Sequence, residues 1–326
     1  MKTLKDINIE NKKVLIRCDF NVPMKEGKIA DDTRITAALP TIKYCLEKNA
    51  KVILFSHLGR VKEASDLEKN NLAPVAKRLE ELLGQPVTFI DKTHGEELEN
   101  AINNMKEKEI ILVQNTRYED LEDKKESKND PELGAYWASL GDVFVNDAFG
   151  TIHRAHASNV GIASHLNSCV GFLIEKELTA LQELDNPKHP FVVVLGGAKV
   201  ADKIGVIENL VKKADKILIG GGMAFTFLKA EGYEIGNSLL DQENIEFCQK
   251  VIKEHPDKIV LPVDVAVTTE YSEKEDYKVK DISDLEYNEM GLDIGPSTEK
   301  LFENYLKEAS IAVWNGPLGV YEFGKY

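Results

Sequence analysis

The sequence predicts an α/β protein built from two doubly wound parallel-sheet domains of the Rossmann-like kind. Its 326 residues are enough for two domains that each bury a core. Short apolar runs rich in β-branched residues recur in both halves and do not alternate with polar residues, as expected for strands buried on both faces of a parallel sheet. Segments with helical spacing separate these runs, and such an alternation is typical of doubly wound sheets.

The first half contains the strand candidates of one domain. These runs are Val14–Ile16, Val52–Phe55, Val87–Ile90, Ile110–Val113 and Val143–Val145. Helical spacing of apolar residues predicts helices over Ile35–Lys48 and Leu72–Leu83, and Gly84 after the second is a typical helix terminator. We therefore place an N-terminal domain at residues 1–172.

The second half repeats the pattern. Its strand candidates are Phe191–Leu195, Lys216–Ile219, Lys258–Leu261 and Ile311–Trp314, with helical spacing over Ile204–Lys213 and Gln242–Glu254. These elements predict a C-terminal domain over residues 187–326. Between the domains, Glu175–Leu184 has a helical pattern that stops before Pro187, so residues 173–186 are the expected connecting helix or hinge. Glu119–Pro131 is highly charged and poor in apolar residues, and we expect an exposed loop there.

Composition excludes several classes of protein. The formal net charge is −14, which disfavours a general nucleic-acid binder. No apolar stretch approaches the roughly 18–20 residues that a membrane span needs, and the N-terminus has no apolar signal core. The four cysteines lie far apart without a Cys-x-x-Cys pair, so neither a zinc site nor a disulfide framework is indicated. We expect a cytoplasmic protein without nucleic-acid or membrane partners, and the sequence singles out no metal-ligating residue.

Arginines follow the predicted strands of the first half. All six lie within the first 154 residues, and Arg78 alone falls inside a predicted helix as an ordinary surface residue. Those within a few residues of a strand end are Arg17, Arg60, Arg117 and Arg154, while Arg34 lies just before a helix near the same rim. Ligands of open parallel sheets bind beyond the carboxyl ends of the strands, and guanidinium groups bind oxyanions in a bidentate manner. The arginines therefore predict a basic cup for a small, multiply anionic metabolite.

Two alternatives stay open for members of this set. Some arginines can pair with nearby aspartates, and Arg17 is the weakest member because Asp19 is close enough to be its partner. His57 can be an ordinary packed histidine, although its place in a rim segment favours contact with a ligand.

In the second half, glycines and lysines, in place of arginines, follow the predicted strands. Phe191–Leu195 is followed by two glycines and then by Lys199 and Lys203, which are four residues apart and hence expected on one face of a helix that opens there. Glycines allow close approach of backbone to a ligand, and a helix N-terminus favours an anion. Glu322, after the last predicted strand, is suited to ribose hydroxyl groups. Neither a P-loop nor a G-x-G-x-x-G fingerprint is present, which disfavours a Rossmann dehydrogenase, and a nucleotide site of another type is the better hypothesis.

Several segments together closely resemble the phosphoglycerate kinase family. They are Arg17–Pro23 (RCDFNVP), Asp31–Ile35 (DDTRI), Ser56–Arg60 (SHLGR), Asn146–Ser158 (NDAFGTIHRAHAS), Gly196–Ile204 (GGAKVADKI), Gly220–Phe225 (GGGMAF), Asp293–Thr298 (DIGPST) and Trp314–Glu322 (WNGPLGVYE). The resemblance covers the whole chain in the family's order.

This resemblance implies two α/β domains flanking a cleft, and reversible phosphoryl transfer between 1,3-bisphosphoglycerate and ADP, giving 3-phosphoglycerate and ATP in glycolysis. Carried over by motif, the residues for the glycerate ligand are Asp19, Asn21, Arg34, His57, Arg60, Arg117 and Arg154. Those for the nucleotide are Gly197, Ala198, Lys199, Lys203, Gly221, Gly291, Asn315, Pro317, Gly319, Val320 and Glu322. Arg34 and Lys203 are the expected catalytic clamp on the transferring group, and closure about the connecting segment is expected to bring donor and acceptor into line.

The resemblance also implies a departure at the C-terminus. Members of the family continue through a further strand, a Gly-Gly-Gly-Asp loop that opens a helix, and a segment that returns to the first domain. From this we expect a truncated second domain that lacks the aspartate for Mg²⁺. Besides a monomeric kinase that uses Mg²⁺ with ATP or ADP, a catalytically impaired fragment that binds 3-phosphoglycerate only therefore remains an alternative.

Overall fold

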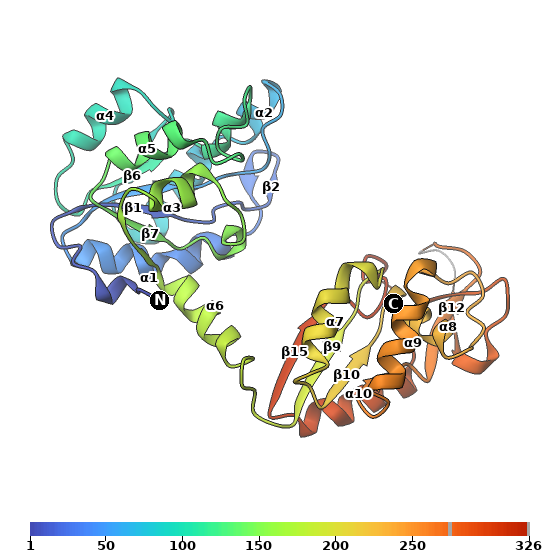
Figure 1. Ribbon diagram of the computed structural model, residues 1–326. Coiled ribbons are helices and arrows are strands. Elements are labelled where there is room, and N and C mark those ends of the chain that lie inside the picture. The colour runs from blue at the N-terminus through green and yellow to red at the C-terminus, as the bar shows by residue number, and fades with distance from the viewer. Residues whose placement is uncertain (273–275, 325–326) are drawn as a thin grey trace. The chain divides into compact units, whose positions relative to one another are not determined.

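The first sheet of the computed structural model is parallel throughout, as the unbroken apolar runs predict. Figure 1 shows the chain with several of its helices and strands labelled. Its strands lie in the order β5-β6-β4-β1-β7-β8. Their bounds are β1 (Lys13–Arg17), β4 (Lys51–Phe55), β5 (Thr88–Ile90), β6 (Ile110–Val113), β7 (Val143–Asn146) and β8 (Asn167–Val170). A short hairpin of β2 (Met24–Lys25) and β3 (Lys28–Ile29) precedes the first long helix. The chain runs outward from β1 in both directions, which is the doubly wound arrangement expected from the sequence.

Helices cover both faces of this sheet. Val14 and Ile16 of β1 pack in the same core as α1 (Thr33–Glu47) and α3 (Ala73–Leu83). Leu15 faces the other way, into the core that contains α4 (Glu96–Asn103) and α5 (Pro131–Ser139). A strand buried on both faces has no polar side to display, and its sequence is therefore continuously apolar. The remaining helices of this part of the chain are the short α2 (Ser65–Lys69) and α6 (Phe172–Gln182).

The second half forms another parallel sheet, in the order β11-β10-β9-β15. Its strands are β9 (Phe191–Leu195), β10 (Lys216–Ile219), β11 (Ile259–Val260) and β15 (Ile311–Asn315). Helices α7 (Ile204–Leu210), α8 (Gly222–Ala230) and α9 (Ile245–Glu254) pack on one face, and α10 (Pro296–Glu308) packs on the other. The predicted α/β class with doubly wound parallel sheets is thus confirmed in both halves.

One part of the second half was not predicted. An antiparallel sheet in the order β13-β12-β14 lies beside the parallel one. Its strands are β12 (Asp264–Thr268), β13 (Lys278–Asp281) and β14 (Met290–Ile294). Only β12 is buried along its whole length, while β13 is mostly exposed and carries charged residues. The outer strand therefore lacks the apolar run that identifies a buried strand.

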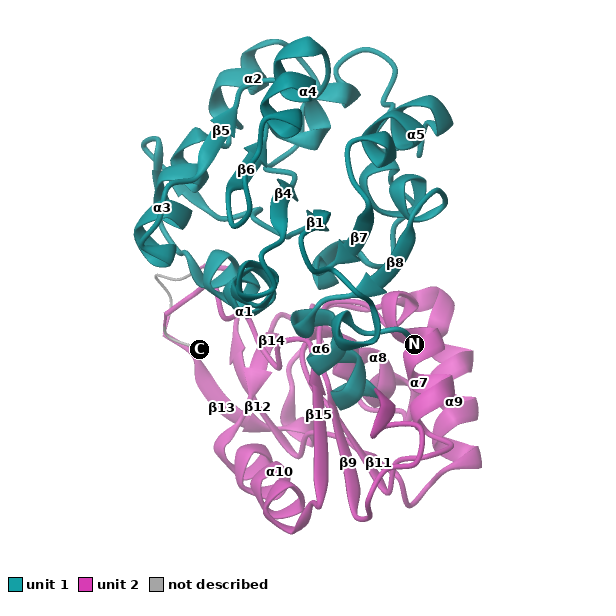
Figure 2. Cartoon of the chain, turned by 90° about the vertical axis from the view of Figure 1, so that its left-hand side faces the viewer, with its two compact units in different colours: residues 1–181 teal, residues 182–326 magenta. Residues whose placement is uncertain are grey.

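The structure describes residues 1–272 and 276–324. The chain divides into two compact units, Met1–Leu181 and Gln182–Tyr326, which Figure 2 colours separately. The division falls inside the expected connecting segment, residues 173–186. Helix α6 begins where Asp147 accepts hydrogen bonds from the backbone N–H groups of Leu173 and Ile174, at 2.9 and 3.4 Å. In the described part of the chain, no helix is both long and apolar enough to cross a membrane.

The segment Glu119–Pro131 is only in part the exposed loop that its charge predicts: Glu122–Lys125 and Lys128 are exposed, but two of its carboxylates are buried. Glu126 is completely buried and Asp120 is 6% exposed. Both carboxylates accept hydrogen bonds within the fold, Glu126 from the backbone N–H of Ser158 at 2.8 Å and Asp120 from that of Ser127 at 2.8 Å. The prediction was wrong for these two residues because charge density along a sequence does not tell which carboxylates find buried partners.

Candidate functional site

The first unit has a polar cavity of about 770 Å³ lined by basic side chains. Arg60 comes from the loop after β4, Arg117 from the 3₁₀ turn Thr116–Asp120 after β6, and Arg154 from the segment after β7. All three therefore reach the cavity from the carboxyl ends of parallel strands. Lys62 and Lys124 line it as well, and the five cations face two carboxylates of the same lining, Asp120 and Glu122. A cavity with this lining is suited to a ligand that carries several negative charges.

Arg117 is the most confined of these cations. Its side chain is 11% exposed, and its Nη1 lies 3.9 Å from Oδ2 of Asp120. Burial lowers its pKa, repulsion from Arg154 and Arg60 lowers it further, and the nearby carboxylates of Asp120 and Glu126 oppose both effects. Among the described residues, its buried Nε has no hydrogen-bond partner. A guanidinium group in this setting gains from an anionic ligand.

Arg34, Asp19 and Asn21 form a neighbouring group at the end of β1. Nη1 of Arg34 donates to Oδ2 of Asp19 at 2.7 Å, and the side chain of Arg34 is 50% exposed. Asn21 accepts a hydrogen bond from the backbone N–H of Gly59 at 2.8 Å, which ties it to the loop that carries Arg60. Within the described part of the chain, these three residues lie outside the lining of the arginine cavity.

Arg17 does not pair with Asp19. It is completely buried, and its Nε donates to Oγ of Ser158 at 2.7 Å while its Nη2 lies 4.0 Å from Glu126. Its Nη2 also lies 3.3 Å from Nδ1 of His57. The alternative that Arg17 pairs with Asp19 is therefore not realised, and Asp19 pairs with Arg34 instead. Arg78 is likewise paired, with Asp32 and Glu81 at 2.7 Å each.

His57 is held as a neutral ring. Its exposed fraction is 7%, and burial, together with the charges of Arg17 and Arg117, lowers its pKa to about 2. Arginine only donates hydrogen bonds, so Nδ1 of His57 must accept from Arg17 and the proton must sit on Nε2. Nε2 of His57 is therefore an N–H donor without a charge, and within the described residues its ring, like Asp19, Asn21 and Arg34, lies outside the lining of the arginine cavity.

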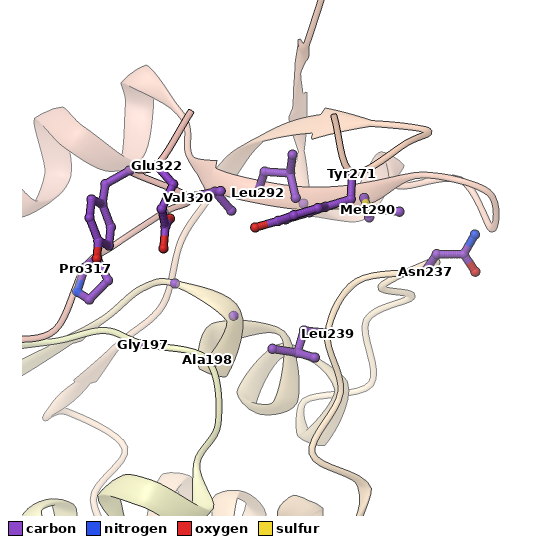
Figure 3. Close-up of a pocket in the computed structure, with 15 residues that line it drawn as sticks. Gly197, Ala198, Asn237, Leu239, Tyr271, Met290, Leu292, Pro317, Val320 and Glu322 are labelled. Carbon is purple, nitrogen blue, oxygen red and sulfur yellow. The ribbon is translucent and has the colours of Figure 1, made fainter. Parts of the chain in front are cut away.

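The second unit has a cavity of about 380 Å³ at the glycine-rich loops (Figure 3). Gly197 and Ala198 border it from the loop after β9, and Figure 3 shows them opposite Tyr271 and Leu292. The loops after β9 and β15 are joined by the N–H of Gly197, which donates to the carbonyl of Pro317 at 2.9 Å. A Cβ on Gly196 would lie 2.0 Å from that carbonyl oxygen, so only glycine allows this approach.

Most of the predicted nucleotide residues gather here. The cavity is lined by Gly197, Ala198, Gly221, Gly291, Pro317, Gly319, Val320 and Glu322. In the described residues, Lys199, Lys203 and Asn315 lie outside this lining. Nζ of Lys203 instead donates to Oδ1 of Asn315, which brings these two residues together.

The expectation that Lys199 and Lys203 share a helix face was wrong. Helix α7 begins only at Ile204, and the residues before it form a 3₁₀ turn, Ala201–Lys203. Lys199 precedes that turn, so helical spacing does not relate the two side chains. The carboxylate of Asp241 accepts from the N–H of Ala201 at 2.9 Å, and the charge of Lys199 contributes to lowering its pKa.

Sequence reasoning missed several residues of both cavities. His156 lines the arginine cavity and Tyr271 lines the glycine cavity. His156 stands in the same segment after β7 as Arg154, and a search of every segment after a strand would include it. Tyr271 follows β12, so it also obeys that rule, but β12 itself was not predicted.

The described residues contain no Mg²⁺ site built from protein side chains alone. Within residues 1–272 and 276–324, no group of three or more His, Cys, Asp or Glu side chains is arranged to hold a metal ion. The donor set of this part of the chain therefore does not fit a resident ion. Mg²⁺ often keeps water ligands and binds through substrate phosphates.

Comparisons with known proteins agree on one family. The family model described as phosphoglycerate kinase matches residues 4–326. The phosphoglycerate kinase of Fusobacterium nucleatum is 58% identical over 329 residues, which cover 100% of this chain and 83% of the relative. That of Enterococcus faecalis is 57% identical over 327 residues, covering 100% of this chain and 82% of the relative.

Solved structures give the same picture. The phosphoglycerate kinase of Coxiella burnetii superposes with a TM-score of 0.86 at 41% identity, covering 98% of this chain and 81% of that one. The enzyme from Pyrococcus horikoshii gives a TM-score of 0.84 at 33% identity, covering 100% of this chain and 83% of that one.

Proposed function

The chain belongs to the phosphoglycerate kinase family, and from this premise we propose how its two cavities divide the substrates. The family's reaction is the glycolytic transfer of a phosphoryl group between 1,3-bisphosphoglycerate and ADP. The cavity of the first unit takes the glycerate ligand, and the cavity of the second unit takes ADP or ATP. The observation that carries this assignment is the convergence of Arg60, Arg117 and Arg154 on one cavity.

The substrate-binding roles follow from the side chains. The residues proposed for the glycerate ligand are Asp19, Asn21, Arg34, His57, Arg60, Arg117 and Arg154. Arginine forks suit its phosphate and carboxylate groups, and the neutral ring of His57 supplies a further donor. The residues proposed for the nucleotide are Gly197, Ala198, Lys199, Lys203, Gly221, Gly291, Asn315, Pro317, Gly319, Val320 and Glu322.

The transfer step needs charge stabilisation more than covalent chemistry. The bond between phosphorus and the carboxyl oxygen of 1,3-bisphosphoglycerate breaks, and a bond forms from that phosphorus to a β-phosphate oxygen of ADP. Negative charge is spread over the transferring group, so fixed cations lower the barrier. Arg34 and Lys203 are the proposed catalytic cations. Arg34 is oriented by Asp19 and Lys203 by Asn315, so each is ordered before the ligand arrives.

Members of the family use ATP or ADP together with Mg²⁺. We propose that the ion enters with the nucleotide, and that residues of this chain act on the phosphates rather than on the metal. The proposed setting is a cytoplasmic monomer without nucleic-acid or membrane partners. The net charge of −14 supports the absence of a nucleic-acid partner.

An assay of ADP formation tests the proposed function. The chain is incubated with ATP and Mg²⁺, with and without 3-phosphoglycerate. We expect ADP to form at a rate that saturates with 3-phosphoglycerate and is near zero without it. Binding of 3-phosphoglycerate without any turnover would favour the alternative of a binding fragment, and failure to bind would overturn the assignment of the arginine cavity.

A further inference from the structure

Glu126 is a completely buried carboxylate next to two residues that line the arginine cavity, Ser127 in sequence and His156 in space. Its Oε2 accepts from the backbone N–H of Ser158 at 2.8 Å, and its Oε1 accepts from Oγ of the same serine at 2.5 Å. Oε1 also lies 3.6 Å from Nδ1 of His156. Burying a charge in this way costs free energy unless partners compensate it, so the position calls for an account beyond packing.

The contacts of Glu126 join two walls of the cavity. Glu126 belongs to the segment that supplies Asp120 and Lys124 to the lining, while Ser158 follows the segment that supplies Arg154 and His156. The backbone is joined at the same place, since the carbonyl of Glu126 accepts from the N–H of Ala157 at 3.0 Å. These walls are far apart in sequence, and Glu126 links them through both its side chain and its backbone.

A hydrogen-bonded relay runs from Glu126 to a proposed substrate-binding residue. Ser158 Oγ donates to Glu126 and accepts from Nε of Arg17 at 2.7 Å. The guanidinium group of Arg17 then places Nη2 against Nδ1 of His57 at 3.3 Å. Because this contact requires an accepting Nδ1, the relay fixes the proton of His57 on Nε2, where it can be donated to an anion.

Glu126 also supplies the buried negative charge for this group of cations. Arg17 is completely buried and Arg117 is 11% exposed. Burial lowers the pKa of both guanidinium groups, and Glu126 acts in the opposite direction on each. The largest of the opposing effects on Arg17 is that of Glu126.

We propose that Glu126 is a positioning residue for the glycerate ligand, which acts by holding Arg17 and, through Arg17, the donor tautomer of His57. It touches no reacting atom itself. The inference rests on the proposed function, since it assigns His57 to the glycerate ligand.

The substitution Glu126→Gln distinguishes two ways in which Glu126 could affect ligand binding: by positioning Arg17 and His57, or only through its negative charge. Glutamine has the size of glutamate but no charge. If only the field mattered, removing an anion beside cations would strengthen binding of an anionic ligand. If Glu126 positions Arg17 and His57, binding becomes weaker. The two accounts therefore predict changes of opposite sign.

We expect Glu126→Gln to raise the calorimetric Kd for 3-phosphoglycerate roughly tenfold, equivalent to the loss of one good hydrogen bond. The dissociation constant for ATP should stay within about twofold, because the nucleotide is assigned to the other unit. Glu132→Gln, the same substitution at an exposed position of α5, is the matched control and should leave both constants unchanged.

Ser158→Ala provides a second variant should the glutamine chain fail to fold. It removes one oxygen from the relay while Glu126 keeps its charge. We expect a severalfold weaker binding of 3-phosphoglycerate. ¹⁵N NMR of His57 adds a readout of the tautomer, which should be the Nε2–H form in the wild type and a mixture in Ser158→Ala.

The outcomes distinguish this inference from the proposed function. If wild-type protein does not bind 3-phosphoglycerate, the proposed function fails. If the wild type binds and Glu126→Gln binds equally well or better, the positioning role of Glu126 is overturned. That role is also overturned if Ser158→Ala leaves both the Kd and the tautomer of His57 unchanged, or if Glu126→Gln weakens ATP binding by the same factor.

Discussion

Arg34 and Asp19 form an ion pair in which Nη1 donates to Oδ2 across 2.7 Å, with Asp19 buried and the arginine side chain half exposed. The buried carboxylate holds Nη1 of the guanidinium group, and within residues 1–272 and 276–324 the structure gives this side chain no other hydrogen bond, so its remaining donors can meet solvent or a ligand. An arginine ordered in this way loses less conformational entropy when it meets a phosphoryl group. This arrangement is the basis for its proposed catalytic role.

Arg34→Ala should lower kcat by about 100-fold or more, as expected when one charge-stabilising donor is removed. Arg34→Lys keeps the charge but not the planar guanidinium group, and its kcat should lie between those of the alanine variant and the wild type. Steady-state rates of ADP formation measure both. A lysine variant as slow as alanine would show that geometry alone decides, and an alanine variant of normal kcat would exclude the catalytic role.

Lys203→Ala should reduce turnover far more than binding of 3-phosphoglycerate, because the lysine belongs to the second unit and the glycerate cavity to the first. We expect the rate of ADP formation to fall strongly while the calorimetric Kd for 3-phosphoglycerate stays unchanged. Lys229→Ala, which removes a lysine paired with Glu234 at 3.0 Å, is a control for loss of a surface charge. An equal fall of turnover and of 3-phosphoglycerate binding in Lys203→Ala would contradict the assignment.

Because of His57, we expect the folded chain to lose stability as the pH falls. Its pKa is about 2 in the folded chain against the ordinary 6.5, so below pH 6.5 the unfolded chain takes up a proton that the folded chain refuses. The stability that His57 contributes is present above pH 6.5 and is lost as the pH falls towards 2. At pH 5 this loss amounts to about 2 kcal/mol.

His57→Gln should therefore reduce the loss of stability between pH 7.5 and pH 5 by about that amount. Urea unfolding at the two pH values measures it. His165→Gln, at an exposed histidine of the same unit, should follow the wild type. A wild-type pH dependence in His57→Gln would show that the ring is not held neutral.

Gly196→Ala should destabilise the second unit and weaken nucleotide binding. Its Cβ would lie 2.0 Å from the carbonyl oxygen of Pro317, so the loops after β9 and β15 would have to separate, at a cost of roughly 2 kcal/mol or more. Gly205→Ala is the matched control, because no atom lies within 4 Å of the added Cβ and the residue sits in α7. Thermal unfolding and an ADP titration of both variants test this, and equal effects would contradict the steric account.

The parallel sheets could be predicted because each core strand has its own apolar run. Val14 and Leu15 face opposite cores. A strand buried on both faces has a continuous apolar run, which identifies it from the sequence alone. Strand β8 carries only Cys169 and Val170 as apolar residues, and β13 is charged and mostly exposed. Such edge strands are stabilised by pairing with a neighbour, which their own sequence does not reveal.

The cavities could be predicted only in part. Because ligands of parallel sheets bind beyond the strand ends, the sequence predicted Arg60, Arg117 and Arg154 as neighbours, and all three line one cavity. It gave no information on which carboxylate would neutralise the buried Arg17, because Glu126 is far from it in sequence and lies in a segment of high charge. Ion pairs between distant segments depend on tertiary contacts that local patterns do not contain.

The most direct test of the central claim is a calorimetric titration of 3-phosphoglycerate into the wild type, Arg60→Ala and Arg78→Ala. Arg60 lines the cavity with an exposed side chain, so its loss should leave the fold intact, whereas Arg78 is paired with Asp32 at 2.7 Å outside the cavity's lining in the described residues. We expect the wild type and Arg78→Ala to bind alike, and Arg60→Ala to bind roughly tenfold or more weakly. Equal binding by all three would contradict the assignment of the glycerate ligand to the arginine cavity.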